Sequence, residues 1–241
     1  MINLKWITGR LVAVMRREGP WGTFQRIVKY VRFMIGLPSK DMREYRRFKA
    51  AMDREYDETH GVDTGGTQLL FDLTIDSPNA ALGGSHIATV PRQFHSAMEG
   101  LDIDVADATF VDLGSGKGRA LMMAAEYPFP KIVGVEFAAE LDAICRTNLE
   151  RLGNRRISCE LGDAAQFRFP GTDLVVFMNN PFDPVLVERI AARLVDSARA
   201  QPRTIRVIYI NPRAPELFGR EPWFHVGSVS GGDIFGLSPP A

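Results

Sequence analysis

The chain has 241 residues, of which 45% are hydrophobic and 24% are charged, and its formal net charge at pH 7 is zero. These values indicate a globular protein of one domain with an added segment, and they exclude a disordered or fibrous chain. The neutral balance argues against a protein whose main task is to bind nucleic acid. No uninterrupted apolar run reaches the roughly 18 residues of a membrane span, and no secretory signal is evident.

Positive charge is concentrated at the start of the chain. Residues 1–50 contain twelve Lys and Arg and three Asp and Glu residues, a net charge of +9, so the remainder carries −9. Hydrophobic periodicity predicts one helix over residues 2–17, a second between Pro20 and Gly36, and a third, highly charged one over Asp41–Tyr56. We therefore expect a helical extension over residues 1–56.

The apolar faces and basic charge of residues 1–36 allow two interpretations. These helices pack on the rest of the protein as a lid, or they form a basic amphipathic anchor on a membrane surface or an acidic partner. Because such faces are common in packed helices, we favour packing and keep peripheral membrane contact as the alternative. Cys145 and Cys159 lack metal-ligand spacing, which predicts reduced core thiols in a cytoplasmic protein without a metal.

A strand, a tight glycine turn and a helix follow one another near the middle of the chain. Residues 57–85 are rich in loop-forming glycines, and a helix predicted over Pro91–Leu101 leads into the segment 109–119, T-F-V-D-L-G-S-G-K-G-R. A helix is predicted from Arg119 to Tyr127. Open α/β sheets bind nucleotide-like cofactors at such a turn, because glycine adopts positive φ and lets a ligand approach the backbone.

The residues of this turn distinguish between cofactors. A dinucleotide fingerprint would have its third glycine at position 119, where this chain has Arg119. Asp112, at the strand end, would repel a pyrophosphate but would attract the ammonium and sulfonium groups of S-adenosylmethionine, which contains no phosphate. We therefore predict S-adenosylmethionine as the cofactor, with Asp112 as one of its ligands. The turn residues expected to bind it are Gly114, Ser115, Gly116 and Gly118.

An acidic residue ends the next predicted strand, Lys131–Phe137. Glu136 lies 20 residues after Gly116, the usual place for a carboxylate that accepts hydrogen bonds from ribose hydroxyls. The alternative is a surface acid at a strand end. We predict that Glu136 binds the cofactor.

Two further predicted strands also end in polar residues. Asp163 follows the run Arg156–Leu161, where a carboxylate can accept a hydrogen bond from an adenine amino group, and Asn179 follows the run Leu174–Met178. Four consecutive strand ends with polar groups suited to one ligand are poorly explained by chance. We therefore add Asp163 and Asn179 to the predicted cofactor site.

The last part of the chain completes the sheet. A helix capped by Asp183 is predicted over Pro184–Ala200, a fifth strand over Arg206–Ile210, and an antiparallel hairpin from Trp223–Val229 and Asp233–Leu237. The pattern predicts an α/β, Rossmann-like fold: a mostly parallel seven-stranded sheet with a C-terminal antiparallel hairpin, preceded by N-terminal helices. We assign this domain to residues 57–241.

Several motifs resemble the class I S-adenosylmethionine-dependent methyltransferases over roughly residues 55–215, and a bacterial subgroup of them more closely. Besides the glycine turn, these motifs are H-G-V-D-T-G-G at 60–66, P-F-P-K-I-V-G-V-E-F at 128–137, N-N-P-F at 179–182 and I-Y-I-N-P at 208–212. Where the subgroup has Y-x-P-T, this chain has His86-Ile87-Ala88-Thr89, so the pocket edge that this segment is expected to close differs here.

Methyl transfer from a sulfonium is an in-line displacement, so the protein must align donor and acceptor and exclude water. Asn180, Pro181 and Phe182 follow the fourth predicted strand, where the acceptor is expected, and carbonyl oxygens there can accept hydrogen bonds from an amino group. We predict these three as the catalytic residues. The alternative is a strand-ending turn with Phe182 in the core, in which case the acceptor would be sought around His86 and Thr89.

The sequence therefore predicts methyl transfer to an N or O nucleophile of a protein side chain or a small molecule that it does not identify. One alternative is a nucleic-acid N-methyltransferase that uses the basic N-terminal segment. Another is a non-catalytic, cofactor-binding protein at a membrane. Intact Asp112, Glu136 and Asp163 argue against a degenerate pocket.

Overall fold

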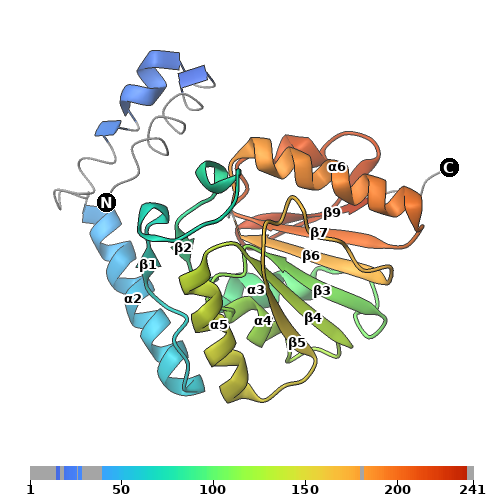
Figure 1. The fold of residues 1–241 in the computed structure, drawn as a ribbon, viewed down its shortest axis with the longest axis horizontal. Helices are drawn as coiled ribbons and strands as arrows, with labels where there is room; N and C mark the ends of the chain where they lie inside the picture. Colours follow the sequence, from blue (N-terminus) through green and yellow to red (C-terminus); the bar gives the residue numbers. More distant parts are fainter. Residues whose placement is uncertain (1–14, 17–18, 26, 29–39, 180–181, 238–241) are drawn as a thin grey trace. The chain divides into compact units, whose positions relative to one another are not determined.

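The computed structural model describes residues 15–16, 19–25, 27–28, 40–179 and 182–237. The chain divides into two compact units, Met1–His60 and Gly61–Ala241, and each is described by itself (Figure 1). The described residues of the first unit are helical, and its helix α2 spans Lys40–His60. α2 runs four residues beyond the predicted end at Tyr56, to the residue before Gly61, whose φ of +66° ends a helix. Most of the predicted helix 2–17 lies outside the described residues.

The second unit is built on a seven-stranded sheet in the order β5-β4-β3-β6-β7-β9-β8. The strands are β3 (Ala108–Leu113), β4 (Lys131–Glu136), β5 (Ile157–Leu161), β6 (Asp173–Asn179), β7 (Ile205–Ile210), β8 (Trp223–Val229) and β9 (Gly232–Leu237). β3 to β7 pair in parallel, and β9 runs antiparallel to both β7 and β8. The prediction of a mostly parallel sheet with a C-terminal antiparallel hairpin is confirmed.

Helices cover both faces of this sheet (Figure 1). They are α3 (Pro91–Glu99), α4 (Arg119–Ala124), α5 (Ala139–Leu152) and α6 (Pro184–Ala200). Alternate residues of a strand point to opposite faces. Val176 accordingly packs in the core on the α6 side, whereas its neighbour Phe177 contacts Phe94 of α3 with ring centroids 5.4 Å apart. The central strands are therefore buried on both faces, which explains their continuous apolar runs.

Two helix ends show how local chemistry sets the boundaries. The Asp183 side chain accepts a hydrogen bond from the Val185 amide at 3.2 Å, which confirms the predicted cap of α6. α4 ends at Ala124, three residues earlier than predicted. There the Arg156 side chain binds the carbonyls of Ala125 and Tyr127 at 2.7 and 3.0 Å, which satisfies carbonyl groups at the helix end.

A segment that the sequence pattern indicated only as loop lies along the carboxyl edge of the sheet. It contains the short strand β2 (His86–Ile87), which pairs antiparallel with β1 (Thr67–Gln68), and the 3₁₀ turns Leu70–Asp72 and Ala80–Leu82. We call residues 74–86 the strap.

Backbone hydrogen bonds fasten the strap to the connections that follow two strands. Thr74 accepts from the Ala139 amide at 3.1 Å, just after β4, and its own amide donates to the Glu140 carboxylate at 2.9 Å. Leu82 accepts from the Asp183 amide at 2.7 Å, just after β6. The strap thus spans the edge at which the parallel strands end.

Candidate active site

A cavity opens at the carboxyl edge of the sheet, where ligands bind in open α/β folds. Residues from the glycine turn, from the ends of β3, β4 and β6, and from the end of the strap line it. The sequence-predicted residues among them are Asp112, Gly114, Ser115, Gly116, Glu136, Asn179 and Phe182. The structure therefore brings together seven residues that are up to 70 positions apart in the sequence. Gly118 and Asp163 do not line this cavity.

The three glycines of the turn all have backbone conformations that favour glycine. Their φ angles are +82° at Gly114, +55° at Gly116 and +89° at Gly118, where any other residue is strained. A Cβ atom on Gly116 would clash with His86, and one on Gly118 would lie 2.7 Å from Cys145 Sγ. Gly116 thus keeps the cavity wall bare, while Gly118 allows the turn to pack on α5.

The amides of this turn bind protein atoms. Those of Gly114 and Ser115 donate to the Val135 carbonyl at 2.8 and 3.1 Å, and that of Gly116 donates to Glu136 Oε2 at 2.8 Å. A phosphate-binding loop directs its amides at the ligand instead. The turn is therefore not arranged as an anion cradle, which agrees with a cofactor that contains no phosphate.

Asp112 is a buried acid on the cavity wall. Its exposed fraction is 3%, and its carboxyl group receives no hydrogen bond from the residues that the structure describes. Burial, and then the nearby Glu136, raise the pKa of Asp112 well above its ordinary value. A carboxylate in such a place is stabilised by a cation, because the cation offsets the cost of burial. This carboxyl group fits the ammonium or sulfonium group of S-adenosylmethionine.

Glu136 lies on the same wall and supports the turn. Besides the Gly116 amide, it accepts a hydrogen bond from the Ala138 amide at 2.9 Å. Burial raises the pKa of Glu136 to about 7, although these backbone hydrogen bonds act in the opposite direction. Each of its oxygens has a further lone pair with which a ribose hydroxyl can bond.

Asp163 contacts the strap. Its Oδ2 accepts hydrogen bonds from Ser77 Oγ and Asn79 Nδ2, both at 2.7 Å, and its Oδ1 accepts from the Ala165 amide. Burial raises the pKa of Asp163, but the hydrogen bonds from Ser77 and Asn79 outweigh it, so the net shift is downward.

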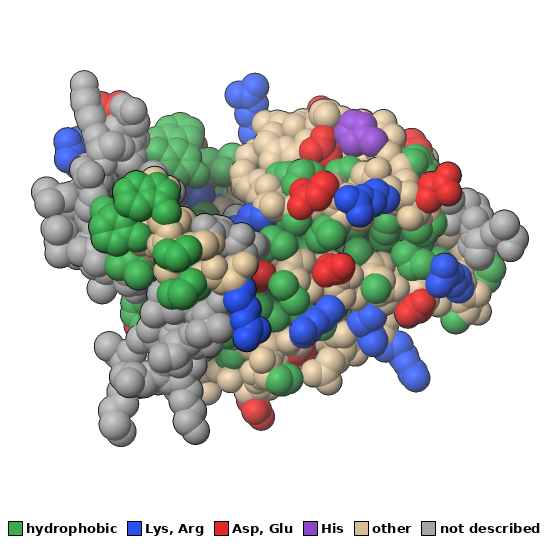
Figure 2. Space-filling model, turned by 90° about the horizontal axis from the view of Figure 1, so that it is seen from above, with side chains coloured by type: hydrophobic (Ala, Val, Ile, Leu, Met, Phe, Trp, Pro, Cys, Tyr) green, Lys and Arg blue, Asp and Glu red, His purple; other side chains and the backbone are tan. Residues whose placement is uncertain are grey.

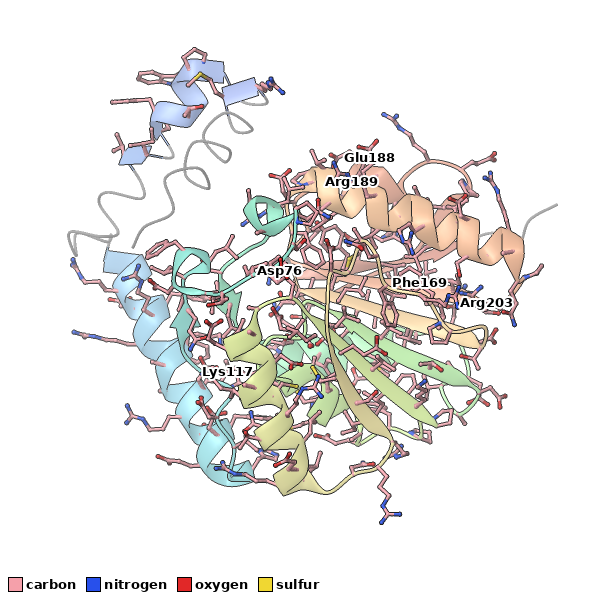
Figure 3. The ribbon with its side chains drawn as sticks, in the orientation of Figure 1. Asp76, Lys117, Phe169, Glu188, Arg189 and Arg203 are labelled. Atoms are coloured by element: carbon pink, nitrogen blue, oxygen red, sulfur yellow. The ribbon has the colours of Figure 1, made fainter. Side chains whose placement is uncertain are left out.

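Asn79 also accepts a hydrogen bond at 2.7 Å from Arg189 of α6, labelled in Figure 3. The strap is therefore fastened to α6 as well as to the end of β5. In this arrangement Asp163 holds the strap, and its predicted contact with adenine stays a prediction.

The loop 61–66, part of the H-G-V-D-T-G-G motif, is bonded to α5 and to the part of the glycine turn that leads into α4. Lys117 Nζ lies 2.7 Å from Asp63 Oδ1, and Asn148 of α5 donates to the carbonyls of Asp63 and Lys117 at 2.7 and 3.0 Å. Arg119 Nε donates to Thr64 Oγ1 at 2.7 Å. Lys117 is labelled in Figure 3 beside α5. These contacts hold the loop against the glycine turn.

The wall of the cavity at the end of β6 carries a short chain of polar side chains. Asn179 Nδ2 donates to Thr89 Oγ1 at 3.1 Å, and Asn179 Oδ1 accepts from Asn211 Nδ2 at 2.9 Å. Phe182 is 3% exposed and also lines the cavity. Asn180 and Pro181, predicted as catalytic, lie outside the described residues.

His86 lies over the glycine turn, close to Gly116. Its Nε2 is 3.2 Å from the carbonyl of Thr64. Because a carbonyl only accepts, this nitrogen carries the proton, and in the neutral ring Nδ1 is then an acceptor. The residue that replaces the Tyr of the resembled subgroup therefore lies on the cavity wall.

The polar groups of the cavity fit a cationic nucleoside better than a dinucleotide. It combines the buried Asp112, a carboxylate at the ribose position in Glu136, and a turn whose amides face inward. Residues 110–200 match the family model described as a methyltransferase domain. These residues form a class I S-adenosylmethionine-dependent methyltransferase domain.

The chain is similar to solved structures of methyltransferases at low sequence identity. A Plasmodium falciparum dimethyladenosine transferase is 15% identical, with 64% of each chain covered and a TM-score of 0.49. A Salinibacter ruber RNA methyltransferase in complex with S-adenosylhomocysteine is 19% identical over 64% of this chain and 94% of that chain, with a TM-score of 0.46. A Geobacter sulfurreducens S-adenosylmethionine-dependent methyltransferase is 20% identical over 56% and 65%, with a TM-score of 0.41.

At these values the likeness says nothing about the substrate of this methyltransferase. The chain spans less than two thirds of the Plasmodium and Geobacter proteins. None of the curated proteins matches it in sequence.

No helix in the described ranges combines the length and apolar character that crossing a bilayer requires. No cluster of His, Cys, Asp and Glu side chains in the same ranges is arranged to hold a metal ion.

Sequence reasoning missed the side chains that act across long sequence distances. Ser77, Asn79 and Asn211 bond to predicted site residues, although 86, 84 and 32 positions separate the partners. Ser77 and Asn79 lie in a stretch without periodic pattern. Asn211 belonged to the I-Y-I-N-P motif, which marked the strand end without indicating a partner.

Proposed function

We propose that this methyltransferase transfers the methyl group of S-adenosylmethionine to a nitrogen or oxygen nucleophile of a protein side chain or a small molecule. The observation that carries the proposal is the buried Asp112 carboxyl on the cavity wall, which has no hydrogen bond from the described residues. When bound, the cofactor supplies a methyl group already activated by a sulfonium. The residues of the chain therefore bind, align and exclude water.

Each wall of the cavity has a distinct task in this proposal. Asp112 holds the cationic end of the cofactor, Glu136 binds the ribose hydroxyls, and the bare backbone at Gly116 allows close approach. The strap covers the carboxyl edge and keeps water from the reacting atoms, which strengthens electrostatic contacts inside the cavity. The remaining wall, formed by Asn179, Thr89 and Phe182, faces the acceptor. The proposal thus assigns Asn179 to the acceptor side, in place of the cofactor contact predicted from the sequence.

The acceptor site of the proposal includes Asn180, Pro181 and Phe182. An acceptor-side contact aligns the nucleophile only when both substrates are bound, so its loss lowers turnover more than cofactor affinity. We expect Asn180→Ala to reduce methyl transfer by roughly one to three orders of magnitude, with S-adenosylhomocysteine affinity within about twofold. Wild-type turnover in this variant would show that Asn180 only closes a turn.

The experiment that tests the proposed function uses methyl-labelled S-adenosylmethionine and cell lysate. The lysate is separated into protein, nucleic acid, lipid and small-molecule fractions after incubation with the purified enzyme. Label in the protein or small-molecule fraction, absent with Asp112→Ala, supports the proposal. Label confined to nucleic acid would replace it with the second candidate, and no transfer to any fraction would reject it.

Nucleic acid as the acceptor is the second candidate because residues 1–50 carry a charge of +9. Among the described residues on the face seen in Figure 2, basic and acidic side chains are mixed and form no stripe of one sign. This mixture disfavours a broad phosphate-binding surface there. A gel shift whose affinity falls steeply with salt would favour this candidate.

Peripheral contact with an anionic membrane is a further part of the proposal, and the described residues of the first unit support it. Trp21 and Phe24 are 69% and 54% exposed and stack with ring centroids 5.7 Å apart. Exposed aromatic residues on a basic helix are typical of segments that lie in a membrane interface. The reduced thiols of Cys145 and Cys159 agree with the cytoplasmic side of that membrane.

Co-sedimentation with vesicles tests this contact. The full-length protein should sediment with vesicles that contain phosphatidylglycerol, less so at high salt, and not with phosphatidylcholine alone. Trp21→Ala should weaken sedimentation, whereas Phe224→Ala, which removes a 40% exposed aromatic residue from β8, should not. Absence of salt-dependent binding would discard the anchor and favour packing of residues 1–36 as a lid.

A further inference from the structure

We propose that Asn211 is a positioning residue of the methyl-transfer site, which holds the amide of Asn179 and, through it, the hydroxyl of Thr89 at the acceptor wall of the cavity. The inference rests on the proposed function, because that function makes this wall the acceptor side. It assigns a task to the Asn of the I-Y-I-N-P motif at 208–212.

The contacts form a continuous chain across the end of the sheet. Asn211 Nδ2 donates to Asn179 Oδ1 at 2.9 Å, and Asn179 Nδ2 donates to Thr89 Oγ1 at 3.1 Å. Asn179 and Thr89 line the cavity, whereas Asn211 does not. Asn211 is exposed and Thr89 is 7% exposed, so the chain leads from the surface to a buried hydroxyl. Asn211 therefore acts on the cavity through Asn179.

The backbone of Asn211 is held in an unusual conformation. Its φ of +50° makes it the only residue other than glycine with positive φ in the described part of the chain. Asn tolerates this region better than most residues, but a residue other than glycine there is still strained. The Asn211 amide donates to the Gly231 carbonyl at 2.7 Å, which anchors the bend to the β8–β9 hairpin.

The bend explains how the side chain reaches its partner. In the parallel register, Asn179 lies opposite Ile210, so an extended residue 211 would continue past the end of β6. The left-handed conformation of Asn211 instead turns the chain at this point, and the side-chain amide of Asn211 reaches the side-chain amide of Asn179. Strain at a residue that touches a cavity residue is typical of functional sites, and here the strained residue orders a side chain of the acceptor wall.

The sharpest variant is Asn211→Gly, because glycine adopts the same φ without strain and removes only the side chain. The assay measures label transferred from methyl-labelled S-adenosylmethionine to the lysate fraction that wild type methylates. We expect the rate to fall about tenfold, the scale of one lost orienting hydrogen bond. S-adenosylhomocysteine affinity should stay within about twofold, and the melting temperature should not fall below that of Asn211→Ala, which adds strain.

A double-mutant cycle separates positioning from a merely structural role. If Asn211 acts through Asn179, adding Asn211→Gly to Asn179→Ala should change the rate by less than about twofold. A full and independent loss in that background would overturn the inference, as would a wild-type rate in Asn211→Gly alone.

A readout independent of turnover is the side-chain amide signal of Asn179 in ¹⁵N-labelled protein, assigned by its absence in Asn179→Ala. We expect Asn211→Gly to shift this signal, since it removes the partner of Asn179 Oδ1. An unchanged signal would overturn the inference even if no acceptor were found. If wild type neither binds S-adenosylhomocysteine nor transfers label, the proposed function fails, and the amide signal still decides whether the contact exists.

Discussion

Asp112 and Glu136 are buried acids on one cavity wall, and the negative charge of Glu136 adds to the rise in the pKa of Asp112. Burial is the main cause of both shifts, and it takes the pKa of Glu136 to about 7. In the unfolded chain Glu136 loses its proton near pH 4.5. Between these values the folded protein holds more protons than the unfolded one, so the free energy of unfolding falls as pH rises through this window.

Stability without cofactor should therefore decrease between about pH 5 and pH 8 through Glu136. Glu136→Gln removes this titration. The free energy of unfolding of the variant relative to wild type should therefore rise with pH, by roughly 1–3 kcal/mol in total. The difference in melting temperature should rise with it. Thermal denaturation at several pH values measures the difference. S-adenosylmethionine, which brings a cation to the pair, should stabilise wild type more at pH 8 than at pH 5. A difference between variant and wild type that does not depend on pH would contradict the assigned titration.

Gly116 and Gly153 form a matched pair for testing the bare cavity wall. Both have positive φ, but a Cβ at Gly116 would meet His86, whereas one at Gly153 would have nothing within 4 Å. Alanine at either position should cost about 1 kcal/mol of stability from backbone strain. Only Gly116→Ala should also lower S-adenosylhomocysteine affinity, by at least about tenfold, as measured by calorimetry. Equal affinities in the two variants would place the cofactor away from Gly116.

Among the elements, the strap sets the shape of the site while contributing few cavity residues. Ser77 and Asn79 donate hydrogen bonds to Asp163, the acid that the sequence predicted as a ligand of adenine. In the structure these bonds fasten the strap. If Asp163 acts through the strap, the double variant Ser77→Ala/Asn79→Ala should lose as much cofactor affinity as Asp163→Ala. Each should also lose about 1.5–3 kcal/mol of stability, the value of hydrogen bonds to a charged group.

The two readings of Asp163 separate in the same calorimetric titrations. A loss of affinity in Asp163→Ala alone, with the double variant unchanged, would instead show direct contact of Asp163 with the cofactor. A shorter deletion inside the strap is less informative, because it would also disturb the backbone hydrogen bonds at Thr74 and Leu82.

How far the sequence could predict these elements depends on the range of the interactions that form them. The parallel strands and α6 follow from local apolar runs and from the Asp183 cap, and the glycine turn follows from its spacing. The predicted end of α4 was wrong because Arg156, more than 25 residues away, donates hydrogen bonds to the carbonyls that follow the helix. The strap has no periodic pattern, since it is held by single hydrogen bonds to distant residues, and pairs such as Asn211 and Asn179 share that difficulty.

At the scale of the whole molecule, the candidate site lies within one of the two compact units. All the residues that line the cavity belong to Gly61–Ala241. We therefore expect a truncated protein that starts near Lys40 to fold and to keep its S-adenosylhomocysteine affinity, while it loses any binding to anionic vesicles. Circular dichroism and calorimetry check both points. Aggregation of the truncated protein would show that the removed residues belong to the core.

The central claim is that a cationic nucleoside cofactor binds between Asp112 and Glu136. Calorimetric titration of the purified protein with S-adenosylmethionine and S-adenosylhomocysteine tests it most directly. We predict micromolar binding, weakened about tenfold to a hundredfold by Asp112→Ala and by Glu136→Ala, since each removes a charge-assisted contact. No binding of either ligand at high micromolar concentration, or unchanged affinity in both variants, would contradict it.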